Sequence, residues 1–415
     1  MATNKEQNKL NVPHLRFPEF HGEWEKCRIG DYGKVVTGNT PPTKDVENYI
    51  DGQYLWASPA DLGTIKSITE TNTKLSSKGF AKTRILPKGS VLVTCIGSTI
   101  GKMGMAMKEM ATNQQINSVV VNEDNNNEFV YYAIQSAFPR YLSSIAVQAV
   151  PIVSKSAFEQ LSNKRPCLQE QEKIGSLFAL LDERIATQSK LIEDLKKLKS
   201  AIVEKVFCSP YQEYPMCRIE GFEQALSTYK MSDFSSRIAT KNKDSKCSLV
   251  LTIAAQYGLV NQESFFNKSV ASENLTGYYL LHKGEFAYNR SYSAGYDWGA
   301  VKRLDNYDEG VLSTLYICFK INETIVDSDY LTYYFESTKW HRGLSDIAGE
   351  GARNHGLLNV SMTDYFNTKH RFPVIEEQKA IAKMLNTITE KERKATLLGE
   401  CYQKQKQYLL CQMFT

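Results

Sequence analysis

The chain has 415 residues, of which 42% are hydrophobic and 23% are charged, and its formal net charge is +4. This length and composition indicate a globular protein with two or three domains. The sequence contains no apolar run of about eighteen residues that could cross a membrane. Residues 1–10 are too polar for a signal peptide. We therefore expect a cytoplasmic protein, and the small net charge does not by itself indicate a nucleic-acid-binding function.

The nine cysteines and six histidines are scattered along the chain. No two cysteines form a C-x-x-C pair, and no two histidines lie four residues apart. An odd number of unpatterned cysteines in a long chain indicates reduced thiols and not a disulfide framework or a zinc site. We expect neither a metal nor a bound cofactor.

The first half of the chain begins as a predicted globule. Between residues 66 and 88, six cations accompany a single acid, Glu70. Such a stretch is typical of a phosphate-binding surface and equally of a solvated face. Farther along, Val91–Ile96 and Ser118–Val121 predict strands, and Glu128–Ala137 predicts a short helix.

The second half repeats this pattern. Val250–Ala254 and Leu312–Phe319 predict strands, and Asp329–Ser337 predicts a short helix. The halves align at offsets of 195, 201 and 207 residues, and the first of these offsets matches Ser118 with Ser313. Each half is therefore predicted to form an α/β or α+β globule.

A long helix is predicted after each globule. Residues 166–207 align without a gap on residues 373–414 with ten identities, and both segments begin Pro-x-x-x-Glu-Gln. Apolar residues recur every three or four positions, and only Gly399 interrupts the second segment, so each helix should be about 57 Å long. Heptad spacing over this length indicates a coiled coil, which is typical both of a spacer and of a helix that only dimerises.

Enzyme signatures are incomplete throughout the sequence. Residues 97–102 (Gly-Ser-Thr-Ile-Gly-Lys) lack the first glycine and the final Ser or Thr of a phosphate-binding loop. The Asn-Thr-Pro-Pro-Thr stretch at residues 39–43 has the wrong order for an amino-methyltransferase site. Glu377 and Lys379 suggest part of a nuclease site but lie on a predicted long helix. We therefore expect no catalytic centre.

The duplicated Pro-x-x-x-Glu-Gln helix resembles the specificity subunits of type I restriction-modification systems. The lead-in Pro13-His14-Leu15-Arg16-Phe17-Pro18-Glu19-Phe20, followed by Trp24, is similar to the typical start of a first target recognition domain in this family. Residues 86–93, 97–102 and 113–117 resemble the strand-loop core of such a domain. The similarity extends over nearly the whole chain, but residues 214–230 contain no equivalent of Trp24 or of the Leu-Arg-Phe-Pro segment.

The resemblance implies two target recognition domains in tandem, each of α/β (α+β) class and each followed by a long helix. The two helices would pack as an antiparallel coiled-coil spacer. The expected division is an N-terminal arm (1–20), recognition domain 1 (21–165), spacer helix 1 (166–209), recognition domain 2 (210–372) and spacer helix 2 (373–415).

The family also implies a function and partners. The chain would be a non-catalytic DNA-binding subunit that reads a bipartite target in double-stranded DNA. Two methyltransferase subunits and two motor-nuclease restriction subunits would dock on it, and they would bind the methyl donor and ATP. Two alternatives remain open. One is a specificity subunit of a type II-like methylase-nuclease system, and the other is a cytosolic coiled-coil scaffold that binds no DNA.

Candidate DNA-contacting residues follow from the chemistry of DNA, because base edges present donors and acceptors in the major groove and phosphates attract cations. In the first domain, the loop candidates are Ser98, Thr99, Lys102, Asn113, Gln114, Gln115 and Asn117, and the phosphate candidates are Lys66, Lys74, Lys78, Lys82 and Arg84. In the second domain, the loop candidates are Tyr288, Asn289, Arg290, Ser291, Tyr292, Tyr296, Trp298, Arg353, Asn354 and His355, and the phosphate candidates are Lys241 and Lys243. The spacer helices should pack along Leu181, Leu191, Leu195, Leu198, Ile388, Leu398, Tyr402 and Leu409.

Overall fold

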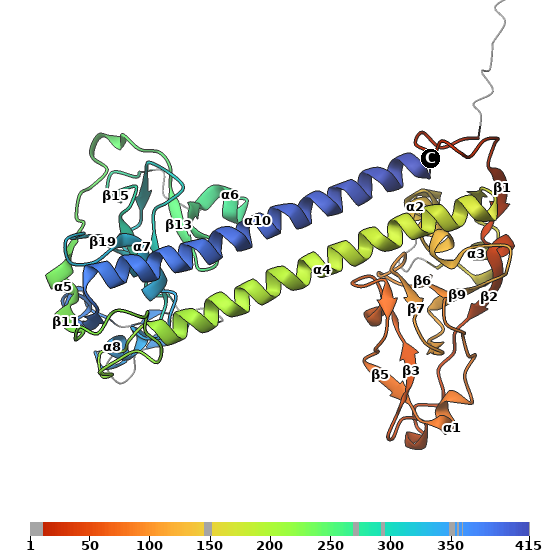
Figure 1. The fold of residues 1–415 in the computed structure, drawn as a ribbon, viewed down its shortest axis with the longest axis horizontal. Helices are drawn as coiled ribbons and strands as arrows, with labels where there is room; N and C mark the ends of the chain where they lie inside the picture. Colours follow the sequence, from red (N-terminus) through yellow and green to blue (C-terminus); the bar gives the residue numbers. More distant parts are fainter. Residues whose placement is uncertain are drawn as a thin grey trace, which may run out of the picture. The chain divides into compact units, whose positions relative to one another are not determined.

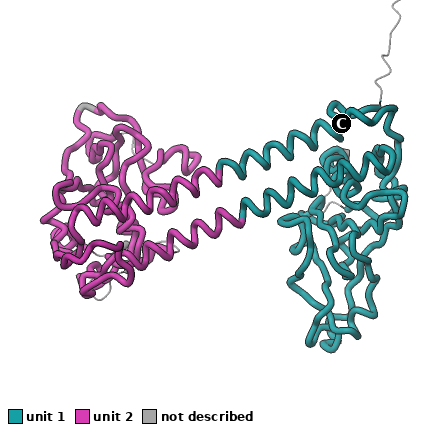
Figure 2. Tube along the Cα trace, viewed as in Figure 1, with its two compact units in different colours: residues 1–189, 397–415 teal, residues 190–396 magenta. Residues whose placement is uncertain are grey.

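The computed structural model describes residues 11–144, 152–268, 274–291, 295–347, 353–354, 357–358 and 360–414. Figure 1 shows the elements along the chain, and Figure 2 shows its two compact units. Unit 1 comprises residues 1–189 and 397–415, and unit 2 comprises residues 190–396. Within the described ranges, no helix combines the length and hydropathy that a membrane span requires.

Unit 1 is built on a five-stranded sheet with the strand order β2-β9-β6-β7-β4. All four residues of the central strand β6 (Val91–Thr94) are buried, because its two faces contribute to different apolar clusters: Val91 and Val93 to one, Leu92 to the other. The remaining elements of unit 1 are β1 (Glu25–Arg28), η1 (Ile29–Tyr32), β2 (Gly33–Thr37), η2 (Val46–Asn48), β3 (Tyr54–Ala57), η3 (Pro59–Asp61), β4 (Ser67–Ile68), β5 (Thr73–Leu75), α1 (Ser77–Phe80), β7 (Met103–Ala106), β8 (Ala111–Thr112), β9 (Ile116–Val121), α2 (Asn127–Ser144), α3 (Lys155–Glu159), β10 (Ser162–Arg165) and the first part of α4 (Leu168–Val206).

An aromatic cluster ties both long helices into the core of unit 1. The ring of Phe129 in α2 lies 5.9 Å from Trp24 and 5.5 Å from Phe414, the residue that follows α10 (Ile375–Met413). Phe178 of α4 lies 5.8 Å from the same Phe414 ring. The core of unit 1 thus contains the beginning of α4 and the end of α10.

Unit 2 has a four-stranded sheet with the order β12-β19-β16-β17. Its core contains the opposite ends of the helices: Phe207, just after α4, lies 5.0 Å from Tyr330, and Leu385 of α10 belongs to the same cluster. The remaining elements of unit 2, with the strands of this sheet, are β11 (Ser227–Lys230), α5 (Met231–Phe234), β12 (Ser235–Arg237), η4 (Lys243–Ser245), β13 (Leu251–Ala254), β14 (Gly258–Asn261), α6 (Gln262–Phe266), β15 (Tyr279–His282), β16 (Phe286–Asn289), β17 (Ala300–Arg303), β18 (Glu309–Leu312), β19 (Ile317–Ile321), α7 (Ser328–Tyr334), α8 (His341–Ser345), β20 (Arg353–Asn354), β21 (Leu357–Leu358), α9 (Met362–Asn367) and β22 (Lys369–Phe372).

The two units repeat one scaffold. Four strands, β2-β9-β6-β7, correspond in order to β12-β19-β16-β17, and the antiparallel pair β1-β10 corresponds to β11-β22. The predicted fold class, tandem α/β globules each followed by a long helix, is therefore confirmed.

Two details of the predicted repeat are wrong. Val91 pairs with Val119 in unit 1 and Phe286 pairs with Phe319 in unit 2, so β9 recurs 200 residues later as β19. The match of Ser118 with Ser313 at an offset of 195 therefore fails. The predicted strand Leu312–Phe319 is in fact the end of β18 and the start of β19, with a turn between them.

The two long helices form as predicted, but the buried face of each helix is not made entirely of the predicted residues. Leu191, Leu198 and Leu398 are 47%, 49% and 43% exposed, so they do not belong to the packing stripe. The heptad positions that are buried or half-buried are Phe178, Leu181, Ile185, Gln188, Ile192, Leu195, Lys199, Ile202 and Val206 in α4, and Ile381, Leu385, Ile388, Glu392, Ala395, Gly399, Tyr402, Lys406, Leu409 and Met413 in α10. The stripe includes polar residues and a glycine, which counting leucines alone does not reveal.

Within unit 1 the two helices run antiparallel. Asp182 of α4 accepts a hydrogen bond of 2.5 Å from Lys406 of α10, and the guanidinium of Arg184 lies 5.3 Å from the ring of Tyr402. Increasing residue number in α4 is thus matched by decreasing number in α10.

A buried histidine gives unit 2 a specific sensitivity to acid. Burial lowers the pKa of His370 to about 3, and its ring nitrogens contact Tyr334 and Thr368. Because the folded pKa lies below the unfolded value, the stability contributed by the neutral ring is complete above about pH 6.5 and is lost as the pH falls towards the folded pKa. Lowering the pH from 6.5 to 5 should therefore cost about 2 kcal/mol through this residue.

Asn163 occupies the equivalent strand position in unit 1, so His370→Asn is a matched substitution. Denaturant unfolding at pH 6.5 and pH 5 should show a smaller acid-induced loss for His370→Asn than for the wild type. An equal loss in both proteins would refute the assignment.

Candidate nucleic-acid interface

Three segments of unit 1 meet at one end of its main sheet. The turn between β6 and β7 (residues 95–102), the turn before β9 (residues 113–115) and the segment before α3 are joined by backbone hydrogen bonds. Cys95 donates to the carbonyl of Gln115 at 2.8 Å, and Val153 donates to the carbonyl of Cys95 at 2.8 Å. We call this region the loop end of unit 1.

The loop end of unit 2 joins the equivalent segments, and Arg290 makes the connection. Its guanidinium donates to the carbonyls of Val360 and Leu315, both at 3.2 Å, and its own carbonyl accepts from Leu358 at 3.0 Å. In each unit, therefore, loops lie at the corresponding end of the main sheet.

The loop end of unit 1 contains most of the predicted loop candidates. Ser98, Lys102 and Gln114 are exposed, and Thr99 and Gln115 are half-buried. Gly101 shapes this turn: its φ is +91°, and a Cβ there would lie 2.9 Å from the ring of Phe138.

Asn113 and Asn117 are not available to DNA. As whole residues they are 7% and 3% exposed. Asn113 accepts from the backbone of Gln115 at 3.0 Å, and Asn117 accepts from Thr37 at 2.7 Å. Both residues shape the loop end and would not read a base from it.

The predicted phosphate-binding lysines of unit 1 are paired with acids, one of them within the same stretch and the others outside it. Lys74 pairs with Glu70 at 2.6 Å, and Lys78 pairs with Glu47. Lys82 pairs with Asp45 at 3.0 Å, and this hydrogen bond lowers the pKa of Asp45. The apparent excess of cations at residues 66–88 is thus compensated, while Arg84 is exposed and donates to the carbonyl of Thr37.

Lys66 has a structural role, and its prediction as a phosphate-binding residue is wrong. Its ammonium group donates to Glu128 at 2.7 Å and to the hydroxyl of Tyr132 at 2.9 Å, and its side chain is 12% exposed. It also lies 3.3 Å from Asp182. Burial alone would raise the pKa of Asp182, but hydrogen bonds from Lys406 and Tyr132 outweigh it and the pKa lies below its ordinary value.

Several predictions in unit 2 also require correction. Tyr288 is completely buried and stacks on Tyr365 at 4.8 Å, so it is a core residue. The side chain of Asn289 accepts from the backbone of Ser291 and fixes the loop. Arg290 is held by two carbonyls, and it therefore anchors the loop end from within.

The remaining predicted DNA-contacting residues of unit 2 differ in burial and in their neighbours. Tyr296 and Trp298 are half-buried against the two cores of the unit. Lys241 lies 3.8 Å above the ring of Tyr279, whereas Lys243 is exposed. Arg353 and Asn354 form strand β20, which pairs with β21. Tyr292 and His355 lie outside the described residues.

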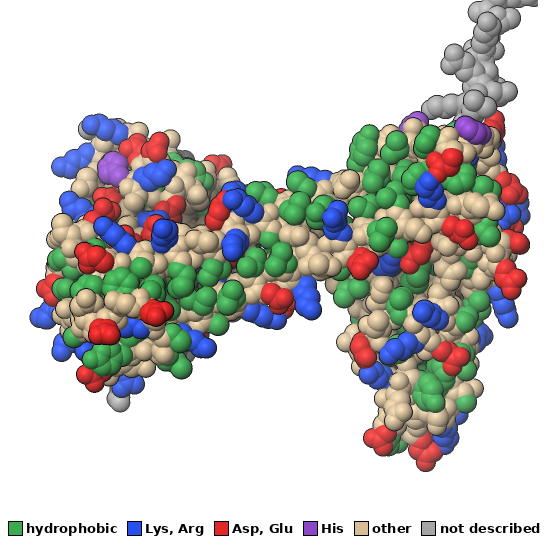
Figure 3. Space-filling view, viewed as in Figure 1, with side chains coloured by type: hydrophobic (Ala, Val, Ile, Leu, Met, Phe, Trp, Pro, Cys, Tyr) green, Lys and Arg blue, Asp and Glu red, His purple; other side chains and the backbone are tan. Residues whose placement is uncertain are grey.

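The face of the molecule shown in Figure 3 is not a simple cationic surface. On the face shown in Figure 3, Lys and Arg side chains are interspersed with Asp and Glu in both units. In the described part of the chain, no three His, Cys, Asp or Glu side chains form a group that could hold a metal ion. The exposed side chains at the loop end of unit 1, Ser98, Lys102 and Gln114, can form hydrogen bonds.

The Pro-x-x-x-Glu-Gln segments form the joint between each globule and its helix. Glu170 is fully buried and accepts two hydrogen bonds from Arg16, at 2.8 and 2.7 Å. Glu377 accepts the same pair from Arg218, again at 2.8 and 2.7 Å. These glutamates bind the lead-in segments, which rules out the nuclease interpretation of Glu377.

This contact also identifies the lead-in segment of the second half, which was not recognised from the sequence. Arg218, within the segment Cys217-Arg218-Ile219-Glu220-Gly221-Phe222, occupies the place of Arg16. The buried Leu226 precedes β11 as Trp24 precedes β1. The paired arginine was present in the sequence, but it could not be found by searching for the aromatic and proline residues around Arg16.

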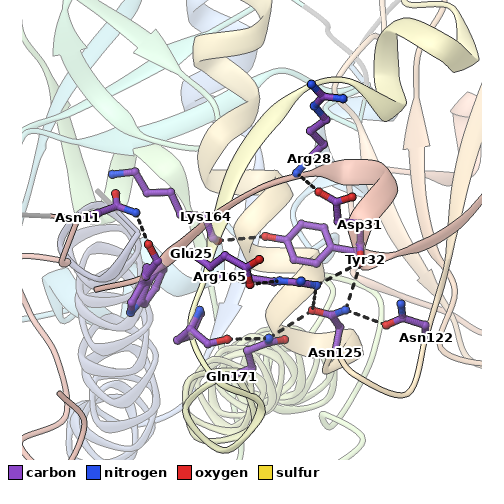
Figure 4. Close-up of polar contacts among 12 residues, drawn as sticks. Asn11, Glu25, Arg28, Asp31, Tyr32, Asn122, Asn125, Lys164, Arg165 and Gln171 are labelled. Carbon is purple, nitrogen blue, oxygen red and sulfur yellow. Dashed lines mark hydrogen bonds and ion pairs between the residues drawn. The ribbon is translucent and has the colours of Figure 1, made fainter. Parts of the chain in front are cut away.

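The glutamines of the two segments complete the joint. Gln171 donates to the carbonyl of Pro166 at 3.0 Å and to the side chain of Asn125 at 3.2 Å, and Figure 4 shows it beside Asn125 and Arg165. Gln378 donates to the carbonyl of Pro373 at 2.9 Å in the same way. Each amide thereby fixes the start of its long helix.

The fold and the two loop ends define a class of protein: a tandem α/β repeat with paired long helices and polar loops at the same end of each sheet. Residues 21–197 match the family model of the type I restriction modification DNA specificity domain. The solved S subunit of a type I restriction-modification system from M. genitalium covers 97% of this chain and 99% of its own, with a TM-score of 0.58 and 16% identity. A structure from a study of the assembly of the type I R-M system has a TM-score of 0.54 and 14% identity.

Sequence relatives agree with this class. The chain is 27% identical over 191 residues to the type I restriction enzyme MjaIX specificity subunit of Methanocaldococcus jannaschii, which is 45% of this chain and 44% of that protein. It is 32% identical over 126 residues to the HindI specificity subunit of Haemophilus influenzae, 30% of this chain and 27% of that protein. The matched segments span less than half of these relatives. The resemblance to type I specificity subunits is confirmed: residues 21–197 match the family model of their DNA specificity domain, and 97% of the chain shares its fold with a solved S subunit.

Proposed function

We propose that this chain is the non-catalytic DNA-reading subunit of a type I restriction-modification complex. Each unit would read one half of a bipartite target in double-stranded DNA through its loop end. Residues 21–165 and 210–372 would be the two recognition domains, and residues 166–209 and 373–415 the helices that space them.

The observation that carries this proposal is the duplicated loop end. The same strand order recurs in both units, and the loops at the corresponding end present different side chains, for example Gln115 in unit 1 and Leu315 in unit 2. A repeated scaffold with varied loops suits a protein that reads two different short sequences with one docking geometry.

The partners follow from the proposed class. Two methyltransferase subunits would supply the methyl donor site, and two motor-nuclease subunits would bind ATP and cut DNA. A specificity subunit of a type II-like methylase-nuclease system would share the same fold, and the genes beside this one would separate the two assemblies. A DNA-binding experiment distinguishes both of these assemblies from a scaffold that binds no DNA.

The purified chain, alone and with its methyltransferase partner, should be tested against a labelled random duplex library and against labelled methyl donor. We expect no methyl transfer by the chain alone, because it would read DNA without carrying the chemistry. With the partner present, we expect methylation and enrichment of one sequence family from the library. Stoichiometric transfer by the chain alone would contradict the non-catalytic role, and a complex that enriches no sequence would favour the scaffold.

A further inference from the structure

The turn that precedes β9 in unit 1 and the turn that precedes β19 in unit 2 have the same hydrogen bonds. Asn113 accepts a hydrogen bond from the backbone of Gln115 at 3.0 Å, and Ser313 accepts one from the backbone of Leu315 at 3.3 Å. The carbonyls of Asn113 and Ser313 each accept from the residue that begins or precedes the strand, both at 3.2 Å. The turn is thus repeated at an offset of 200 residues, the same offset as the strand that follows it.

The third residue of this turn is anchored through its backbone in both units. The carbonyl of Gln115 accepts from the amide of Cys95 at 2.8 Å. The carbonyl of Leu315 accepts from the guanidinium of Arg290 at 3.2 Å. Because the backbone is fixed by a different residue, the third side chain can vary without changing the turn.

In unit 1, hydrogen bonding fixes which end of the Gln115 amide is free. Oδ1 of Asn113 is occupied by a backbone N–H, so its Nδ2 must be the atom that donates to Oε1 of Gln115 at 3.0 Å. The Nε2 of Gln115 is therefore left as a donor, and it lies beside Gly97 of the β6–β7 turn. Among the described residues, no hydrogen bond from this Nε2 is formed.

In unit 2, the same position holds an apolar side chain. Leu315 is 59% exposed on this hydrogen-bonded turn. Its only polar contacts are made by its backbone, so its side chain presents methyl groups at the place where Gln115 presents a donor.

We propose that this third turn residue determines specificity in each unit: Gln115 donates to guanine, and Leu315 contacts the methyl group of thymine. This assignment rests on the proposed function. Guanine is the base that presents two acceptors, N7 and O6, in the major groove, whereas adenine presents one acceptor beside an amino donor, thymine one acceptor beside a methyl group, and cytosine an amino donor. One lone pair of the Gln115 oxygen is engaged by Asn113, so the free group that this side chain offers to a base edge is its Nε2 donor. Lys102, a donor-only side chain, lies at the same loop end.

The proposal is tested with the chain in complex with its methyltransferase partner. Duplexes bound from a randomised library are sequenced for the wild type and for Gln115→Leu, Gln115→Glu and Leu315→Gln. We expect Gln115→Glu to replace one guanine of one half-site by cytosine, because a carboxylate accepts from the cytosine amino group. Leu315→Gln should alter one thymine of the other half-site and leave the first half-site unchanged.

Base analogues separate a direct contact from a structural effect. Replacing the assigned guanine by 7-deazaguanine removes the N7 acceptor and should weaken binding of the wild type by about 5- to 150-fold. Gln115→Leu should be insensitive to this replacement, and the turn tolerates leucine at this position in unit 2. Equal sensitivity of both proteins, or unchanged half-sites in all three variants, would overturn the assignment. A wild-type complex that enriches no sequence would instead refute the proposed function on which it rests.

Discussion

Replacing Arg16 with methionine should destabilise unit 1 by about 3–5 kcal/mol, because the substitution leaves a buried charge without its partner. Glu170 has a side-chain exposure of 0%, and Arg16 supplies two of its hydrogen bonds. Without Arg16, the indole of Trp24, at 3.3 Å, is the remaining donor to this carboxylate that the structure describes. Hydrogen exchange read by mass spectrometry should place the loss of protection in residues 11–189 and 397–414.

Arg218→Met provides the matched variant, because Arg218 binds Glu377 with the same geometry in unit 2. Its loss of protection should fall within residues 190–396. The double substitution Arg16→Met with Glu170→Met removes both charges and should recover most of the lost stability. A cost below about 1 kcal/mol for Arg16→Met would contradict the view that this ion pair holds the globule to its helix.

Lengthening both long helices by one heptad should widen the gap between the two half-sites by about three base pairs. Seven residues add about 10.5 Å to a helix, and DNA rises 3.4 Å per base pair. Insertions after Ser189 and after Thr396 lie at equivalent points of the repeat and at the boundaries between the units. A full heptad preserves the phase of the buried stripe, so each half-site should keep its sequence.

The control is the same insertion in α4 alone, which makes the two helices unequal. We expect this variant to lose sequence-specific methylation and not to acquire a longer gap. Mapping of methylated adenines in cells that carry each variant with its partners gives the answer. An unchanged gap in an active double-insertion variant would show that the helices do not set the spacing.

The sequence predicted the repeating elements well, because hydrophobic period and length are local properties. The two long helices and the central strand β6 could be located from the order of the residues. The phase of the helical stripe was harder to locate. Ile192 is half-buried and Leu191 is exposed although the two are equally apolar, and the polar residues Gln188 and Lys199 at stripe positions obscure the phase in the sequence.

Long-range pairing explains most of the remaining errors. Lys66 looked like a surface cation because Glu128 and Asp182, its partners, lie far away in the sequence. Tyr288 looked like a loop aromatic because the sequence does not show that Tyr365 covers it. The second lead-in was missed because its single essential residue, Arg218, lies among neighbours unlike those of Arg16.

The measurement that tests the central claim most directly is a genome-wide map of modified bases in cells carrying this chain with its methyltransferase partner. Two loop ends on one repeated scaffold predict a single methylated motif with two short defined blocks, separated by a gap of fixed length and undefined sequence. Removing the gene for this chain alone should abolish the modification. A continuous motif without a gap, or modification that persists without the chain, would contradict the account.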